Sequence, residues 1–325
     1  MPGADDLAGP LADLLGDLWG APGVTIEGLR RLSGGASRET WSFDAVRSDG
    51  DRVPLILQRQ RPGVVRTGGG MASEAALLRA AAATGVPVAP LVVSEADEAR
   101  LGAPFMVLER VEGETIARRI LRDDAYAAAR PRLAAQCGRA LAAIHRIPRD
   151  AAPQLEHQDQ VAQYREILDV FGEPHPAFEL AFRWLAAHRP PAGPTTVVHG
   201  DFRHGNLIIG PDGLRAVLDW ELAHLGDPME DVGWLCVKAW RFGAAPPVGG
   251  FRDYEDLFAA YGEAAGVAVD PEVVRWWEVL GTLKWGIMCM MQARSHLDGM
   301  VRSVELAAIG RRVCENEHDL MLVLP

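Results

Sequence analysis

Apolar residues in the first third of the chain follow the spacing of one helix and then of several strands. Leucines at helical spacing predict a helix over residues 7–19. A second helix is expected over about residues 71–83, after a glycine-rich break. The apolar runs that predict strands cover residues 24–32, 40–46, 53–60 and 105–111. These elements predict a small sheet with one helix over about residues 20–110.

Helical spacing dominates the rest of the chain, apart from a strand-like block over residues 195–220. The helices that this pattern predicts cover residues 124–147, 158–171, 175–188, 229–242, 251–265, 271–298 and 301–318. We therefore predict an α+β fold with two lobes. A small β-rich N-lobe is expected over residues 1–110, and a large, mostly helical C-lobe over residues 111–325. A hinge is expected near residues 109–113.

The charge balance argues against nucleic acid as a partner. Lys and Arg total 33 and Asp and Glu total 44 in 325 residues, which leaves a net charge of −11. Contacts to nucleic-acid phosphates need clustered basic side chains, which an acidic chain does not favour. The hydrophobic share of 48% and the charged share of 24% are those of an ordinary globular protein. A chain of 325 residues is also long enough to bury a sizeable core.

The cysteines and the apolar segments predict a cytoplasmic protein without a membrane partner. The four cysteines are far apart and form no CxxC pair, as expected for thiols in a reducing compartment. The first twenty residues carry four aspartates and no Lys or Arg, so no signal peptide is expected. The most apolar long stretch, residues 276–291, contains Glu278 and Lys284 and falls short of a membrane span.

Polar side chains suited to phosphoryl transfer gather between residues 199 and 221. This reaction needs a carboxylate that orients or deprotonates the attacking hydroxyl, and oxygen ligands for Mg²⁺. Asp201 can be that carboxylate. Asn206 and Asp219 can be the ligands, because Mg²⁺ is a hard cation that takes oxygen ligands and keeps several waters.

A predicted hairpin explains how Asn206 and Asp219 could meet. The turn signal Pro211-Asp212-Gly213 separates two apolar runs. A three-residue loop would pair Gly210 with Leu214 and place Asn206 opposite Leu218, one residue from Asp219. Because side chains on neighbouring strands lie about 5 Å apart at Cβ, one ion could contact both.

The same block resembles a known family. Asp201 and Asn206 have the spacing of the kinase catalytic loop H-R-D-x-x-x-x-N, with Gly200 in place of Arg. This His-Gly-Asp form, followed by Leu-Asp-Trp-Glu and Gly-Asp-Pro motifs, resembles the aminoglycoside phosphotransferase family over about residues 25–300. Arg203, the Trp-Glu pair and residues 34–40 are most similar to the branch related to kinase domains fused to some acyl-CoA dehydrogenases.

The resemblance implies a protein kinase-like bilobal fold that uses ATP and Mg²⁺. Asp201 would be the catalytic base or hydroxyl-orienting residue, and Arg203 would face the γ-phosphate. Asn206 and Asp219 would bind Mg²⁺. His199 would brace the loop, and the aspartates at 227 and 231 would have structural roles.

The N-lobe would bind the nucleotide. The small-residue turn between the first two strands would approach the phosphates through Ser33, Gly34, Gly35, Ala36 and Ser37.

The third strand has no Lys to pair with a helix Glu, as kinases require. We expect Arg59 to pair with Glu74, and Gln58 is the alternative because it points to the opposite face. Backbone groups of Glu109 and Val111 would bind adenine.

The expected acceptor is a small hydroxylated molecule, bound by segments within residues 155–190 and 271–300. Acidic residues there are scattered rather than clustered, which argues against a polycationic aminoglycoside. The branch resemblance suggests a hydroxylated acid or an acyl thioester. Two alternatives are weighed against this enzyme. A non-catalytic nucleotide-binding homologue would explain the missing third-strand Lys. A protein kinase is disfavoured, because the chain has no long activation loop after Asp219.

Overall fold

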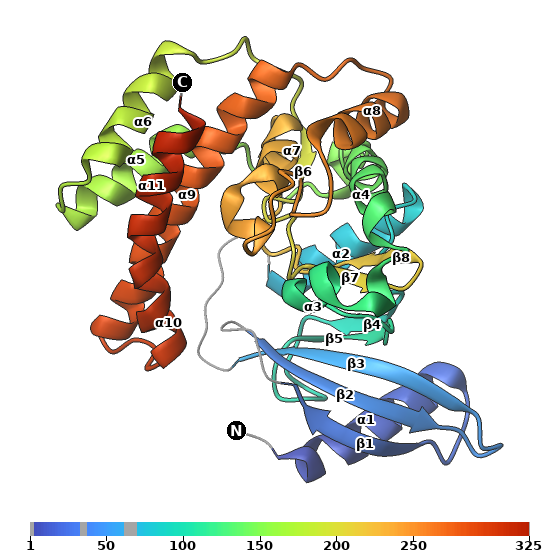
Figure 1. Cartoon of the computed structure of the whole chain (residues 1–325). Helices are drawn as coiled ribbons and strands as arrows, with labels where there is room; N and C mark the ends of the chain where they lie inside the picture. The colour runs from blue at the N-terminus through green and yellow to red at the C-terminus, as the bar shows by residue number, and fades with distance from the viewer. Residues whose placement is uncertain (1–2, 33–37, 62–69, 325) are drawn as a thin grey trace. The chain divides into compact units, whose positions relative to one another are not determined.

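The computed structural model describes residues 3–32, 38–61 and 70–324 (Figure 1). The chain divides into two compact units. The first ends at Glu112 and also includes Asp150–Gln154, and the second consists of Gly113–Arg149 and the chain from Leu155 onward. The first unit contains a five-stranded sheet and the second is mostly helical, which confirms the predicted α+β class.

The first unit is an antiparallel sheet with the strand order β1-β2-β3-β5-β4. Its strands are β1 (Thr25–Arg31), β2 (Arg38–Val46), β3 (Arg52–Gln60), β4 (Leu91–Glu95) and β5 (Phe105–Glu109). Strand β4 is not among the predicted strands, because its apolar run is only three residues long and follows two prolines. Helix α1 (Ala4–Trp19) packs its buried leucines against one face of β2 and β3, and α2 (Gly70–Ala83) contacts β4 and β5.

The second unit is organised around the long helix α9 (Pro271–Leu297), which contacts α5, α6, α7, α10 and α11. The other helices are α3 (Ala117–Arg122), α4 (Arg130–Ile144), α5 (Gln160–Phe171), α6 (Pro176–Ala187), α7 (Met229–Cys236), α8 (Tyr254–Ala265), α10 (Val304–Ile309) and α11 (Val313–Val323). Two short strand pairs complete the unit: β6 (Thr196–Val198) with β9 (His224–Gly226), and β7 (Leu207–Gly210) with β8 (Gly213–Val217). Figure 1 shows α9 and α11 side by side.

The helices predicted over residues 229–242 and 301–318 are each interrupted. The first ends at Cys236 and continues as a 3₁₀ turn over Lys238–Arg241, and the second divides into α10 and α11 around a 3₁₀ turn. No helix within the described ranges combines the length and the apolar content of a membrane-spanning segment.

A glycine sets the distance between α7 and α9. A Cβ atom added to Gly233 would lie 2.6 Å from the Cβ of Trp277 and 2.9 Å from the backbone nitrogen of Glu278. We expect Gly233→Ala to lower the free energy of unfolding by about 1–3 kcal/mol, as overpacking of a core does. Urea unfolding followed by tryptophan fluorescence would measure it. The control is Gly9→Ala in α1, where an added Cβ meets no atom within 4 Å. Equal stability of the two variants would contradict this close packing.

Candidate active site

The β7–β8 hairpin places Asn206 opposite Leu218, although its turn differs from the prediction. Gly210 pairs with Gly213 and not with Leu214, so the loop has two residues and the expected three-residue loop is wrong. A register shift further along the hairpin restores the spacing. The Leu218 N–H then donates to the Asn206 carbonyl oxygen at 2.8 Å, which confirms the predicted cross-strand position of Asn206.

Three donors hold the carboxylate of Asp201, which lies on the loop between β6 and β7. Its Oδ1 accepts hydrogen bonds from Arg203 Nε and Trp234 Nε1, both at 2.9 Å. Its Oδ2 accepts from Asn206 Nδ2 at 2.6 Å. An ionised carboxylate has about four acceptor positions, so this arrangement orients Asp201 and leaves capacity for one more hydroxyl donor.

Arg203 folds back onto the loop to which it and Asp201 belong. Its Nη1 donates to the carbonyl oxygen of His204 at 2.8 Å, and its guanidinium carbon lies 4.6 Å from the centre of the Trp240 ring. The structure brings Arg203 to Asp201, a contact that the sequence analysis did not predict. Its role toward a γ-phosphate stays a prediction.

Asp231 of α7 fixes the backbone that precedes Asp201. Its two oxygens accept the N–H groups of His199 at 2.7 Å and Gly200 at 2.8 Å, and His145 Nε2 lies 3.2 Å away. Burial by itself raises the pKa of Asp231, but the hydrogen bond and charge of His145 and the hydrogen bond from the His199 backbone N–H outweigh it and hold the pKa below its usual range. The expected structural role of Asp231 thus has a physical basis in these contacts.

His199 also braces the loop from the other side. Its Nε2 donates to the carbonyl oxygen of Leu218 at 3.0 Å, while its Nδ1 accepts from the Asp201 N–H at 3.2 Å. These two contacts require the tautomer with its proton on Nε2. His199 therefore links the Asp201 loop to the strand end that precedes Asp219.

The donor set fits a magnesium ion. Both N–H bonds of Asn206 Nδ2 are directed at Asp201, one to the carbonyl oxygen at 3.0 Å and one to Oδ2, so Oδ1 is the atom left to ligate a cation. Asp219 has a left-handed backbone with φ = 61°, which is uncommon outside glycine and is found at functional sites. Mg²⁺ is usually held by one or two protein oxygens plus waters and phosphates.

Within residues 3–32, 38–61 and 70–324, no group of three His, Cys, Asp or Glu side chains could hold a metal ion. The assignment of Asn206 and Asp219 as Mg²⁺ ligands stays a prediction.

The expected pairing of Arg59 with Glu74 is wrong. Arg59 faces the α1 side of the sheet, where it bonds Glu39 at 3.0 Å. Glu74 instead binds Arg38 of β2, with distances of 2.6 Å to Nη1 and 2.5 Å to Nη2. The reason is strand alternation: residues 38 and 58 share one face of the sheet, and residues 39 and 59 share the other. Gln58 accepts from Arg38 Nη1 at 3.1 Å on the Glu74 side.

The predicted phosphate-binding turn is not part of the described structure. Ser33, Gly34, Gly35, Ala36 and Ser37 lie outside the described residues.

Glu109 ends β5, and its N–H already donates to the carbonyl oxygen of Pro90 at 2.9 Å, so only its carbonyl could meet adenine. Val111 is half-buried and follows the last paired residue of the strand.

A pocket of about 260 Å³ lies within the second unit. It is lined by residues 157–161 and 189–195 and by Trp276 and Trp277, which belong largely to the segments predicted to bind the acceptor. Asp201 is not among the lining residues. The pocket therefore does not place an acceptor hydroxyl at the Asp201 carboxylate.

Sequence analysis assigned no role to Arg38, which contacts Glu74, or to Trp234, which contacts Asp201. Arg38 lies at the end of the Gly-Gly-Ala-Ser-Arg motif, so the motif itself was the available signal. Trp234 is 33 residues from Asp201, within a predicted apolar helix, and nothing in the local pattern separates it from a core tryptophan.

Several solved structures named as phosphotransferases share this fold. A Ralstonia eutropha protein assigned as an aminoglycoside phosphotransferase superposes with a TM-score of 0.73 at 21% identity, covering 97% of both chains. A macrolide 2′-phosphotransferase from Brachybacterium faecium gives 0.63 at 20% identity, covering 93% of this chain and 97% of the other. Spectinomycin phosphotransferase, solved with ADP and spectinomycin, gives 0.67 at 13% identity, covering 97% and 98%. These likenesses confirm the kinase-like bilobal fold.

The sequence comparison identifies the family. The profile described as the phosphotransferase enzyme family (APH) matches residues 28–277, and the chain belongs to this family. Among curated mouse proteins, acyl-CoA dehydrogenase family member 10 is 30% identical over 221 residues, which is 62% of this chain and 20% of that protein. Family member 11 is 26% identical over 216 residues, 59% of this chain and 27% of that protein. The chain thus matches about a quarter or less of these relatives' length.

Proposed function

We propose that this chain is an ATP- and Mg²⁺-dependent phosphotransferase that moves the γ-phosphate of ATP to a hydroxyl group of a small molecule. The observation that carries the proposal is the buried Asp201 carboxylate, which is oriented by hydrogen bonds from Arg203, Trp234 and Asn206. Family membership supports phosphotransfer in general. The identity of the phosphoryl donor, the metal and the acceptor are the parts that we propose.

The reaction that these residues support is a direct transfer. Asp201 would accept the proton of the acceptor hydroxyl as the new oxygen–phosphorus bond forms, and the bond between the γ-phosphorus and the bridging oxygen would break to release ADP. Arg203 would offer its remaining N–H groups to the transferring phosphoryl oxygens. When bound, Mg²⁺ neutralises charge on the phosphates. Asn206 Oδ1 and the Asp219 carboxylate would hold it.

For the acceptor we propose a hydroxylated acid or a hydroxyacyl thioester rather than an aminoglycoside. The curated relatives named above carry acyl-CoA dehydrogenase names, and this chain matches only a portion of each. The acidic residues of the segment 155–190 are scattered along the sequence, and two carboxylates at the pocket, those of Asp159 and Glu230, are paired with Arg189 and Lys284.

Arg38 would take the phosphate-facing role that was expected of Arg59. We expect Arg38→Met to raise the KM for ATP by about tenfold or more, because a guanidinium forms strong charge-assisted bonds with phosphate. The matched control is Arg59→Met, which removes the same group from the opposite face of the sheet. That variant should lose stability through its buried Glu39 partner and keep the KM for ATP within about twofold. A larger KM effect at Arg59 would reverse this assignment.

The pairing of Arg38 with Glu74 bears on the non-catalytic alternative. That alternative was motivated by the absence of a third-strand Lys. Because Arg38 supplies a cation to Glu74 from the second strand, the missing Lys does not leave the helix carboxylate without a basic partner. The contact favours the active enzyme over a nucleotide-binding homologue.

The proposal is tested by ADP release over a panel of hydroxy acids, hydroxyacyl-CoA thioesters, amino alcohols and aminoglycosides. We expect ADP release with Mg²⁺ and ATP to rise well above the acceptor-free rate for a hydroxy acid or hydroxyacyl thioester, and to vanish in EDTA. If no acceptor raises the rate while calorimetry still detects ATP binding, the non-catalytic reading is supported instead. A response to aminoglycosides alone would contradict the proposed acceptor class.

A further inference from the structure

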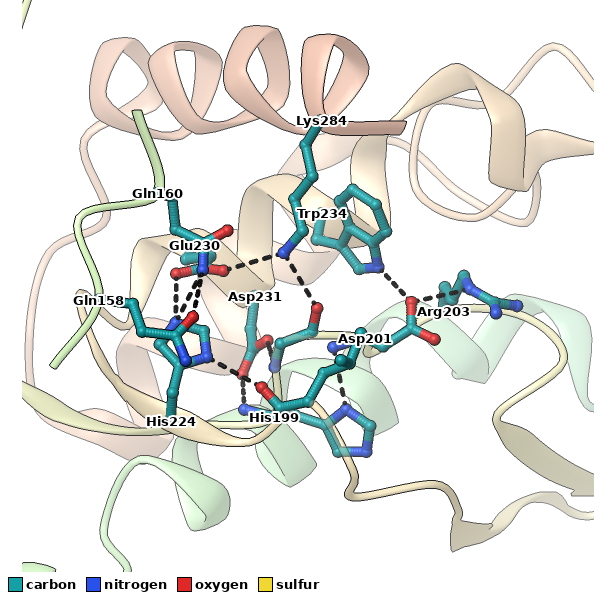
Figure 2. A network of polar contacts seen from close by, with 12 residues as sticks. Gln158, Gln160, His199, Asp201, Arg203, His224, Glu230, Asp231, Trp234 and Lys284 are labelled. Atoms are coloured by element: carbon teal, nitrogen blue, oxygen red, sulfur yellow. Dashed lines mark hydrogen bonds and ion pairs between the residues drawn. The ribbon is translucent and has the colours of Figure 1, made fainter. Parts of the chain in front are cut away.

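One of the donors to Asp201 comes from outside its own loop. Arg203 and Asn206 lie on the segment that follows Asp201, whereas Trp234 lies on α7 and reaches Asp201 Oδ1 through its indole N–H at 2.9 Å. Only 2% of the Trp234 side chain is exposed, so its ring cannot leave without unpacking the core. Figure 2 shows this contact between α7 and the loop.

We propose that Trp234 is a positioning residue for phosphoryl transfer, whose indole N–H fixes the Asp201 carboxylate in the orientation that accepts the proton of the acceptor hydroxyl. This inference rests on the proposed function and extends it to a residue that does not touch the reacting atoms. The alternative is that Trp234 is a packed aromatic residue whose N–H happens to find an acceptor.

The neighbouring tryptophans separate these two interpretations. Trp234, Trp240 and Trp285 form a contiguous aromatic cluster, with ring centres 5.2 Å and 4.8 Å apart along the series. The buried indole N–H groups of Trp240 and Trp285 have no hydrogen-bond partner among the described residues. Packing in this cluster therefore does not require a bonded N–H. Trp234 differs from the other two in directing its N–H at a carboxylate.

A buried ammonium group supports the Trp234 ring from its other side. Lys284 of α9 places Nζ 4.8 Å from the centre of the indole, within the range of a cation–π contact. The same Nζ lies 3.4 Å from the carbonyl oxygen of Gly200, the residue before Asp201. Lys284 therefore contacts both the positioning indole and the backbone of the loop that it positions.

Polar groups around Lys284 keep its amine charged. Burial alone lowers the pKa of Lys284, but Tyr164, Glu230 and the Asp201 carboxylate outweigh it and leave the pKa raised, so the amine is charged at neutral pH. Glu230 lies 3.4 Å from Nζ and accepts from His224 Nε2 at 3.0 Å. Figure 2 marks the contacts from His224 to Glu230 and from Glu230 to Lys284, and the 4.8 Å distance adds the contact from Lys284 to the Trp234 ring. These contacts hold the Trp234 ring in the position from which its N–H binds Asp201.

Two phenylalanine substitutions test the proposal. Trp234→Phe keeps an aromatic ring against Lys284 and removes the N–H that binds Asp201. Trp285→Phe makes the same chemical change, in the same cluster, at an indole whose N–H has no partner among the residues described. Both variants would be compared with the wild-type chain by steady-state kinetics with Mg²⁺, ATP and the acceptor that the panel identifies, and by thermal unfolding.

We expect Trp234→Phe to lower kcat about tenfold, the effect of one hydrogen bond to a charged group, with the KM values for ATP and acceptor within about twofold of wild type. Trp285→Phe should keep kcat within about twofold and unfold at a similar temperature. Equal kcat values for the two variants would overturn the proposal. A raised KM for the acceptor at unchanged kcat would also overturn it, since Trp234 would then contribute to binding.

An activity-independent measurement separates this proposal from the proposed function. In ¹⁵N-tryptophan-labelled protein, the indole N–H signal of Trp234, assigned by its absence in Trp234→Phe, should shift in Asp201→Ala while that of Trp285 stays in place. An unmoved Trp234 signal would contradict the contact even in an inactive protein. If the signal shifts in Asp201→Ala but the wild-type chain transfers no phosphate to any acceptor, the contact is supported and the proposed function is contradicted.

Discussion

Asp201→Asn is expected to lower the rate of phosphoryl transfer by about three orders of magnitude, within the range for loss of a general base. The substitution keeps the size of the side chain and removes its charge and its capacity to take a proton. Asp201 is buried and its two oxygens accept from three donors, which fix the orientation of the carboxylate. ATP affinity, measured by calorimetry, should stay within about twofold, because Asp201 is not among the residues proposed to hold ATP or Mg²⁺.

The control for this prediction is Asp212→Asn, the same substitution at an exposed turn residue of the β7–β8 hairpin. It should leave the rate unchanged. Wild-type turnover in Asp201→Asn would remove Asp201 from the reaction. A loss of both turnover and folded structure would be visible in circular dichroism and would point to a structural role for the carboxylate.

Asp231→Asn is expected to lower the free energy of unfolding by about 3–5 kcal/mol, the scale for breaking a buried charged network. Asp231 is fully buried, and its two oxygens accept the N–H groups of His199 and Gly200. An amide offers one oxygen and one NH₂ group, so one of these N–H donors would face another donor. Urea unfolding would measure the loss, with Asp212→Asn as an exposed control expected to unfold at the same urea concentration as wild type.

The pH dependence of stability tests whether the charge on Asp231 stabilises the loop. Because its pKa is lowered in the folded state, its contribution is fully present above its unfolded pKa of about 4 and is lost as pH falls through the lower folded value. The stability difference between wild type and Asp231→Asn should therefore be constant near neutral pH and shrink below about pH 4. A difference that does not change with acidification would show that the Asp231 charge is not what stabilises the loop.

The sequence around the β7–β8 hairpin was enough to predict the cross-strand position of Asn206. The turn signal after Gly210 and the apolar runs around it placed Asn206 opposite Leu218, even though the loop length was wrong by one residue. The error had no effect on the site because a bulge in β8 compensated for the shorter loop. Cross-strand positions near a hairpin end are thus accessible from sequence, since turn chemistry restricts the register.

Contacts that depend on which face of a sheet meets a helix could not be predicted from the sequence. Alternation separates Gln58 from Arg59, but it does not say which of the two faces α2. The structure places Gln58 toward Glu74 and turns Arg59 to the α1 side. That choice is made by the packing of α1 and α2 on the sheet, for which a single strand carries no signal.

Contacts between distant helices were missed for a similar reason. Lys284 lies in α9, within the most apolar long stretch of the sequence, and its contact with the Trp234 ring depends on how closely α7 and α9 approach. That approach depends on Gly233 and on side-chain packing over separations of tens of residues. Helical periodicity predicted that α9 is buried, but it could not identify the residue that Lys284 contacts.

The most direct test of phosphotransfer is the stoichiometry of the reaction. An Mg²⁺-ATP reaction with the acceptor that responds best would be quenched at intervals, and ADP, phosphorylated acceptor and inorganic phosphate would be quantified by ³¹P NMR and mass spectrometry. We predict one phosphorylated acceptor for each ADP, with no inorganic phosphate above the enzyme-free level and no product in Asp201→Asn. ADP accompanied by inorganic phosphate and an unmodified acceptor would contradict transfer to a hydroxyl group.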